Sequence, residues 1–149
     1  MKMNKKGITL IELIVVFVII AVGATLMIPN MGAWLPSYRL RSATRDLVST
    51  MRNAQMKAVS TNLTYRVSFT LPKTYLLQYL NTNGVWVDEG LATSLPKGVT
   101  ISALNLSSGT NAQFNPNATS SSGSVTLQNN RGTQRQLTIT PSTGRVTTP

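Results

Sequence analysis

Hydrophobic and polar positions divide the chain into three segments with different periods. Residues 8–28 are almost continuously apolar, residues 37–60 repeat apolar side chains every three or four positions, and residues from 63 onward often alternate with a period of two. These patterns predict an apolar helix, an amphipathic helix and a set of β-strands. The expected fold class is therefore α+β, with a long N-terminal helix whose amphipathic half packs against an antiparallel β-sheet domain.

The apolar segment is long enough to cross a membrane. Its 21 residues would span about 30 Å as a helix, which is the thickness of a bilayer's hydrocarbon core. Because backbone amides in lipid must hydrogen-bond internally, the segment is predicted to be helical. Four polar or small residues interrupt it, namely Thr9, Glu12, Gly23 and Thr25.

Two ordinary interpretations of this segment are a secretory signal and a plain membrane anchor. A signal would use Lys2, Lys5 and Lys6 as its charged start and Ala21–Gly23 as its cleavage site, but the run exceeds the usual ~7–15 apolar residues. Nearby charges do not orient a plain anchor, because three lysines precede the run and three arginines follow it within about 20 residues. Neither interpretation explains the carboxylate inside the run.

Glu12 indicates a third interpretation. A carboxylate in a membrane helix costs about 2.5–3.5 kcal/mol near mid-membrane, and the apolar run contains no basic partner. Cleavage after Gly7 would create one, the free amine of Ile8, about one helical turn away or on a neighbouring chain. Two such charges ~4 Å apart attract by about 4 kcal/mol at an effective dielectric near 20, before desolvation is subtracted.

The residues around this carboxylate resemble a known family. Lys5–Leu13 is similar to the processing site of type IV prepilins, which has a short basic leader ending in Gly and a Glu at the fifth mature position. Pro29 is the twenty-second residue counted from Ile8, where many pilins carry a helix-kinking proline. The resemblance implies cleavage between Gly7 and Ile8, N-methylation of Ile8 and an assembly salt bridge through Glu12. Ile8 departs from the pattern, since Phe or Met is commoner there.

Residues 30–62 are assigned to the amphipathic helix, after a leader at 1–7 and a membrane and assembly helix at 8–29. Ser37 is expected to cap its start, and Thr61-Asn62 its end. Arg41, Arg45 and Arg52 lie off the apolar stripe and either contact phosphate or lipid or form a solvated face. The stripe, at spacings of three and four, consists of Leu40, Ala43, Leu47, Met51, Ala54 and Ala58.

Residues 63–149 form the predicted β domain, with about six or seven short strands. The Asn83-Gly84 pair is a strong hairpin signal. The polar stretch Ser107–Gly123, in which Phe114 is the single large apolar residue, is expected to be a flexible loop or a partner surface. The apolar positions of the expected strands lie at 65–69, 75–80, 85–87, 99–103, 125–127 and 137–139.

The domain resembles the H-type minor pseudopilins of type II secretion and the FimT/FimU-type minor pilins. The resemblance implies a subunit that initiates or caps a fibre, anchored in the bacterial inner membrane by one span with its C-terminal domain in the periplasm. Its implied partners are prepilin peptidase, other pilins or pseudopilins, and an inner-membrane platform with its ATPase. The matching segments, in the family's order, are Met51–Ala58, Leu95–Ile101, Phe114–Pro116 and Gly144–Val146.

DNA binding is the alternative function. FimT-type proteins are associated with DNA uptake through basic residues around a Gly-Arg-x-Arg motif. Here Gly144-Arg145 matches the start of that motif, while Thr147 replaces the second Arg. Arg131 and Arg135 could join Arg145 in a basic patch that contacts phosphates.

Composition argues against catalysis and cofactors. The 149 residues include no His and no Cys, which excludes imidazole and thiolate chemistry, and there is no P-loop or Gly-rich dinucleotide turn. The chain is therefore expected to be a structural subunit without a cofactor or metal. The net charge is +10, and it becomes +7 once the three leader lysines are removed. The four acidic residues are Glu12, Asp46, Asp88 and Glu89.

Overall fold

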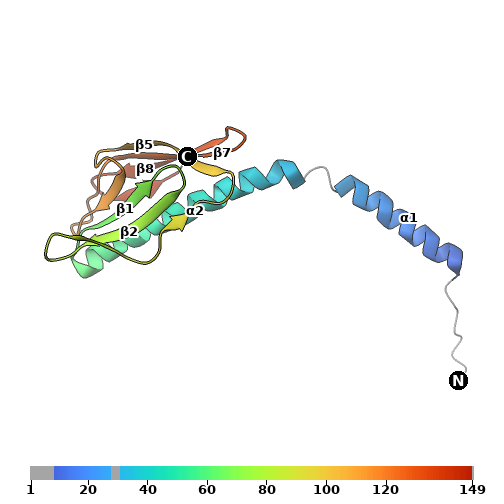
Figure 1. The fold of residues 1–149 in the computed structure, drawn as a ribbon, viewed down its shortest axis with the longest axis horizontal. Helices are drawn as coiled ribbons and strands as arrows, with labels where there is room; N and C mark the ends of the chain where they lie inside the picture. Colours follow the sequence, from blue (N-terminus) through green and yellow to red (C-terminus); the bar gives the residue numbers. More distant parts are fainter. Residues whose placement is uncertain (1–8, 28–30, 149) are drawn as a thin grey trace, which may run out of the picture. The chain divides into compact units, whose positions relative to one another are not determined.

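The computed structural model describes residues 9–27 and 31–148, and the chain divides into two compact units, Met1–Leu35 and Pro36–Pro149 (Figure 1). Helix α1 occupies Leu10–Met27 in the first unit, which confirms the predicted apolar helix over that range. Within the described residues, no helix is both long enough and apolar enough to cross a membrane. Gly7, Ile8 and Pro29, predicted as cleavage site, methylated residue and kink, lie outside the described residues.

Helix α2 occupies Met31–Thr61, so the predicted start with a cap at Ser37 is wrong. Pro36 is the sixth residue of α2, beyond the four N–H groups that lack helical partners, so one backbone hydrogen bond of the helix is absent there. The predicted end is confirmed. Asn62 follows the last helical residue with a φ of 55°, a left-handed conformation that Asn tolerates at a helix terminus.

The predicted apolar stripe of α2 is confirmed as the centre of the core. All six of its side chains are at most 1 % exposed, and they belong to one buried cluster with apolar residues of the strands. Four of the six positions hold Ala or Met, and these small or flexible side chains let strands approach the helix closely. Figure 1 shows α2 running along the strands of the second unit.

The first sheet has five strands, all of whose pairings are antiparallel. Its order is β3-β2-β1-β6, and β4 also pairs with β2. The strand predicted around 65–69 is confirmed, with Tyr65, Val67 and Phe69 facing the core. The bounds are β1 Tyr65–Thr70, β2 Thr74–Leu80, β3 Trp86–Asp88, β4 Thr93–Ser94 and β6 Asn111–Phe114.

The second sheet has four antiparallel strands in the order β5-β7-β8-β9. The predicted last hairpin is confirmed as β7 and β8, whose buried residues include Val125, Leu127, Leu137 and Ile139. The described residues thus form nine strands in two sheets, rather than the six or seven expected. The bounds are β5 Val99–Leu106, β7 Gly123–Asn129, β8 Gln134–Thr140 and β9 Arg145–Thr147.

The expectation of a flexible loop over Ser107–Gly123 is wrong for its centre. Strand β6 lies within this stretch and pairs with β1, and Ala112 and Phe114 are completely buried. The polar neighbours hydrogen-bond locally, since the Gln113 N–H donates to the Ser121 hydroxyl oxygen at 2.9 Å. Pairing with the edge of β1 therefore orders the polar segment around β6. Only two of its side chains, Ala112 and Phe114, have to be apolar, because only these are fully buried in the core.

The C-terminal tail is also more ordered than the sequence suggests. Strand β9 extends the second sheet, and Val146 is 2 % exposed opposite the buried Ile139. The side-chain amide of Gln55 on α2 donates to the Thr143 carbonyl oxygen at 2.7 Å. The tail therefore fixes the position of α2 against the β8 side of the sheet.

The stability of the folded chain is expected to depend on pH through two groups, the buried Tyr75 and the paired Lys57. Burial raises the pKa of Tyr75 above its ordinary value of 10.0, against a smaller opposing effect of its hydrogen bond with Thr50. A hydrogen bond from its ammonium to the carboxylate of Glu89 raises the pKa of Lys57 above 10.5. Both groups bind their proton more tightly in the folded chain, so their stabilisation is present below about pH 10 and is lost at higher pH.

We therefore expect the free energy of unfolding to fall between about pH 9 and pH 12. The half-exposed Lys57–Glu89 pair contributes at most about 1 kcal/mol of this fall. Denaturant titrations across this range measure the change, and the variant Tyr75→Phe should show a shallower fall than the parent. Equal slopes in the two proteins would contradict the role of Tyr75.

Candidate functional site

The first turn of α1 is organised around Thr9 and Glu12. The backbone N–H of Glu12 donates to the carbonyl oxygen of Thr9 at 3.1 Å and lies 3.4 Å from its hydroxyl oxygen. Thr9 thus occupies the cap position and Glu12 the third helical position, the spacing of a capping box. Glu12 is also favoured there by the positive end of the helix dipole.

Sequence reasoning missed this role of Thr9. The signal was present, because Thr followed three residues later by Glu before an apolar run is a helix-start pattern. Glu12 therefore stands at the third position of a capped helix start, besides being the residue predicted to form a salt bridge. Its side chain is exposed, and none of the described residues forms an ion pair with it.

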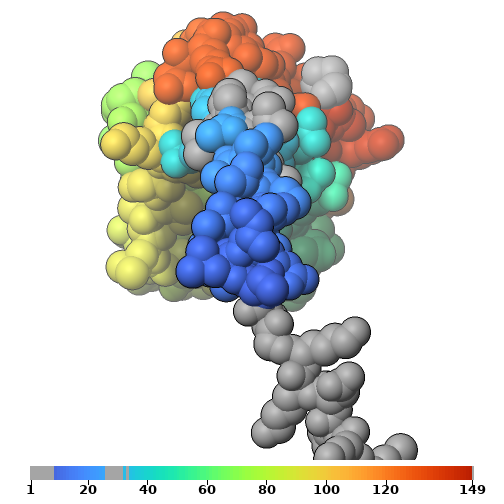
Figure 2. All heavy atoms as spheres, turned by 90° about the vertical axis from the view of Figure 1, so that its right-hand side faces the viewer, coloured from blue at the N-terminus to red at the C-terminus, as the bar shows by residue number. Residues whose placement is uncertain are grey.

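The apolar side chains of α1 are exposed on all sides of the helix. Phe17 is 63 % exposed, and Figure 2 shows this helix, in blue, with its side chains on the surface. Such a continuous apolar surface requires a cover of lipid or protein. The large exposed residues, all between 46 % and 76 %, are Leu10, Ile11, Leu13, Ile14, Val15, Val16, Phe17, Val18, Ile19, Ile20 and Val22.

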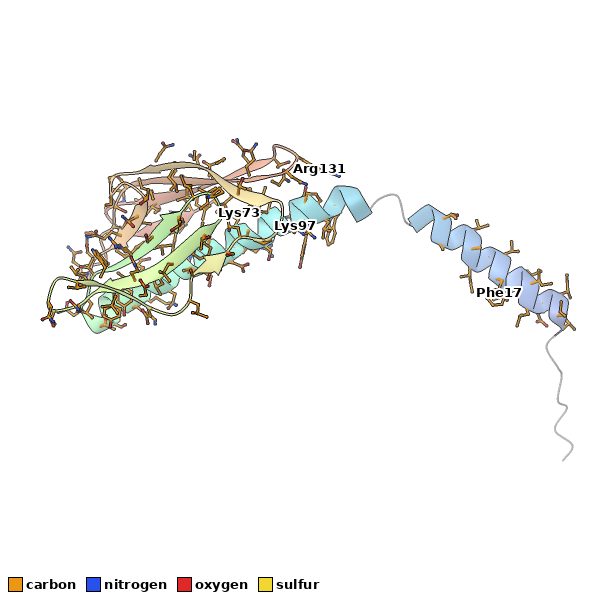
Figure 3. All side chains as sticks on the ribbon, in the orientation of Figure 1. Phe17, Lys73, Lys97 and Arg131 are labelled. Carbon is orange, nitrogen blue, oxygen red and sulfur yellow. The ribbon has the colours of Figure 1, made fainter. Side chains whose placement is uncertain are left out.

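The structure separates the three arginines predicted to form a DNA-binding patch. Arg131 lies in the turn between β7 and β8 (Figure 3). Arg135 is two positions before the buried Leu137 in β8, and alternate residues of a strand point to the same face. Arg135 is therefore on the face of the sheet that packs against the helix. Arg145 pairs with the exposed Thr140 at the other end of β8, in the outward-facing row. Arg135 and Arg145 are therefore not on one face.

Arg135 instead lines the same hollow as three arginines of α2. Arg41, Arg45, Arg52 and Arg135 line one hollow of about 900 Å³ between α2 and the β8 side of the domain. We call this feature the arginine groove. The α2 residues that line the groove recur at spacings of three or four positions, so they share one face of the helix. Arg41 and Arg52 each follow a residue of the buried stripe by one position in the sequence, so this face lies beside the buried one. These three arginines of α2 are exposed, which agrees with the predicted solvated face, but the sequence did not reveal that they share a hollow with a strand some 90 residues away.

Two family models match the chain. Residues 43–144 match the family described as type II transport protein GspH, and residues 2–28 match the prokaryotic N-terminal methylation motif. The first match begins at Ala43, the second residue of the buried stripe of α2, and continues through the strands to the turn before β9. The second contains the predicted leader, cleavage site and Glu12. Comparison with curated protein sequences gives no significant match.

Solved structures share the fold at low sequence identity. The type IV minor pilin FimU of Pseudomonas aeruginosa is 17 % identical with a TM-score of 0.60, over 76 % of this chain and 90 % of that one. The minor pseudopilin EpsH of the type II secretion system of Vibrio cholerae is 10 % identical with a TM-score of 0.63, over 76 % of this chain and 94 % of that one. The expected pilin-like α+β fold is thereby confirmed.

Proposed function

The chain belongs to the type II transport protein GspH family, and from this premise we propose that it is a minor pilin or pseudopilin that helps to initiate or cap a fibre. The observation that carries the proposal is one carboxylate, Glu12, in the first turn of a helix whose apolar side chains are exposed all round. Lipid would cover that helix before assembly, and helices of neighbouring subunits would cover it afterwards.

Maturation would supply the partner that Glu12 lacks among the described residues. Prepilin peptidase would remove residues 1–7, leaving Ile8 with a new terminal amine that is then N-methylated. That amine remains a cation after methylation, and it would pair with Glu12 of its own or a neighbouring chain. The match of residues 2–28 to the methylation motif supports this step.

The proposed location and partners follow from the same premise. The mature chain would be anchored in the bacterial inner membrane by one N-terminal helix, with its β domain in the periplasm. An inner-membrane platform and its ATPase would drive assembly, because the sequence contains no nucleotide-binding motif of its own. The chain's own contribution would be structural: helix packing, one ion pair and the surface of its β domain.

DNA uptake, the alternative function, would require a phosphate-binding surface. The predicted residues do not supply it as one patch, since Arg135 and Arg145 lie in opposite rows of the second sheet. Thr147 also stands where the FimT-type motif has its second arginine. We therefore propose the structural role rather than DNA binding.

Replacing Gly7 tests the proposal at its first step. In cells, Gly7→Leu should leave the precursor uncut, because a branched side chain replaces the small residue on the leader side of the bond. Mass spectrometry of the membrane fraction should find the parent chain starting at Ile8 and the variant starting at Met1.

The matched control is Gly23→Leu, which alters the alternative cleavage site of a secretory signal. No described side chain or backbone atom outside the local helix lies within 4 Å of a Cβ at Gly23, so the substitution is sterically tolerated. It should leave cleavage after Gly7 unchanged. A parent chain that starts after Gly23, or that keeps Met1, would contradict the proposed function.

A further inference from the structure

The arginine groove is an exposed, strongly basic hollow that the proposed function does not use. Its α2 side combines arginines with two apolar side chains, Val48 and Met56, and Met56 is 65 % exposed. Positions 41, 45, 48, 52 and 56 are three or four residues apart, so they form one continuous face of the helix. The groove therefore offers both cations and apolar surface to one ligand.

No acidic side chain offsets these charges inside the groove. Asp46 is on α2 but does not line the groove, and in the first sheet Asp88 ends strand β3 and Glu89 follows it. Arg41 and Arg45 are four residues apart on a helix, where like charges destabilise one another. A bound anion would relieve that repulsion, and guanidinium groups bind carboxylates with paired hydrogen bonds.

The chemistry of the lining favours an acidic protein segment over a nucleic acid. Among the described lining residues none is aromatic, so the bases of a single strand would have nothing on which to stack, and the phosphates of a duplex would leave Val48 and Met56 without apolar contacts. Val48 and Met56 would instead contact the apolar side chains of a segment whose carboxylates meet the arginines. An amphipathic helix or extended segment with acidic residues fits this combination.

A second copy of this chain is a poor partner. Without the leader the chain keeps 11 basic residues and four acidic ones, so two copies brought together at the groove would repel. The partner must therefore be another kind of chain. Resting on the proposed function, we propose that the arginine groove docks an acidic, partly apolar segment of a different subunit of the same fibre.

Site-specific crosslinking in cells tests this proposal on the full chain. Benzoylphenylalanine replaces Asn53, which lines the groove, and in a second strain replaces Phe17 on α1. We expect Asn53 to crosslink to another fibre subunit, at an acidic segment identified by mass spectrometry. The double variant Arg45→Glu/Arg52→Glu should lower that yield at least about tenfold, while crosslinking from Phe17 persists.

The charge-matched control is Lys73→Glu/Lys97→Glu. Both lysines are exposed and lie outside the groove, at the positions labelled in Figure 3. This variant lowers the net charge by the same amount and should crosslink as the parent does. Replacing the acids of the mapped partner segment by Lys should restore crosslinking in the Arg45→Glu/Arg52→Glu chain.

Other outcomes overturn the proposal. The first is a crosslink from position 53 to a second copy of the chain, to nucleic acid or to a segment without acidic residues. The second is an equal loss of crosslinking in the lysine control. The third is a charge swap that does not restore the crosslinking yield. Crosslinking from Phe17 alone would reject the docking surface and leave the proposed function standing. Crosslinking to other subunits from neither position would reject the proposed function as well.

Discussion

Glu12→Ala should produce a chain that enters the membrane and is cleaved, yet is absent from fibres. Removing the carboxylate makes insertion easier, since the charge costs about 2.5–3.5 kcal/mol in a membrane helix. Assembly loses an attraction of up to about 4 kcal/mol with the amine of Ile8, before desolvation. Immunoblots of the membrane fraction and of sheared fibres measure the two steps separately.

The capping role of Glu12 requires a control, because a failure of assembly could also follow from a frayed helix start. Thr9→Ala removes the hydroxyl near the Glu12 N–H but leaves the carboxylate, and it should cost about 1 kcal/mol of helix stability without blocking assembly. Glu12→Gln keeps the shape and removes the charge, so it should fail as Glu12→Ala does. Assembly of Glu12→Gln, or an equal defect in Thr9→Ala, would contradict the ion pair.

The helices were predictable because their determinants are local. The stripe that contains Leu47 and Met51 has the period of a helix, and a sequence window of two turns is enough to reveal it. The start of α2 was mispredicted because the apolar stripe begins at Leu40, and Ser37 is the nearest capping residue before it. The turns from Met31 to Pro36 lie outside that stripe, so its period does not reveal them.

The missed features depend on contacts between distant parts of the chain. Strand β6 has a polar composition, and only its pairing with β1 decides that Ala112 and Phe114 turn inward. The arginine groove requires Arg135 to lie beside α2, which follows from how the second sheet packs on the helix. At the candidate site, Glu12 stands out from the sequence because an isolated carboxylate in an apolar run is costly wherever the helix packs, and its salt bridge stays a prediction.

Gly123→Ala should cause the largest loss of stability among glycine-to-alanine substitutions in the β domain. Gly123 begins β7 with a φ of 140°, and it pairs with Leu106 at the end of β5. A Cβ there would lie 2.0 Å from the carbonyl oxygen of Asn105 and 2.8 Å from the Cα of Leu106. Both contacts are with backbone, so relief requires the end of the edge strand β5 to move away from the start of β7, which disrupts their pairing.

Backbone strain and overpacking each cost about 1–3 kcal/mol, so we expect Gly123→Ala to lower the free energy of unfolding by at least about 3 kcal/mol. Gly132→Ala is the matched control, with a φ of 83° and its nearest neighbouring atom, the amide nitrogen of Gln128, 3.8 Å away. Gly132→Ala would place an alanine at a positive φ without a steric clash, so it should lower the free energy of unfolding by about 1–2 kcal/mol. Thermal unfolding of the full chain in detergent compares the two. Equal losses would mean that backbone conformation, and not the close approach of β5 to β7, makes glycine necessary at position 123.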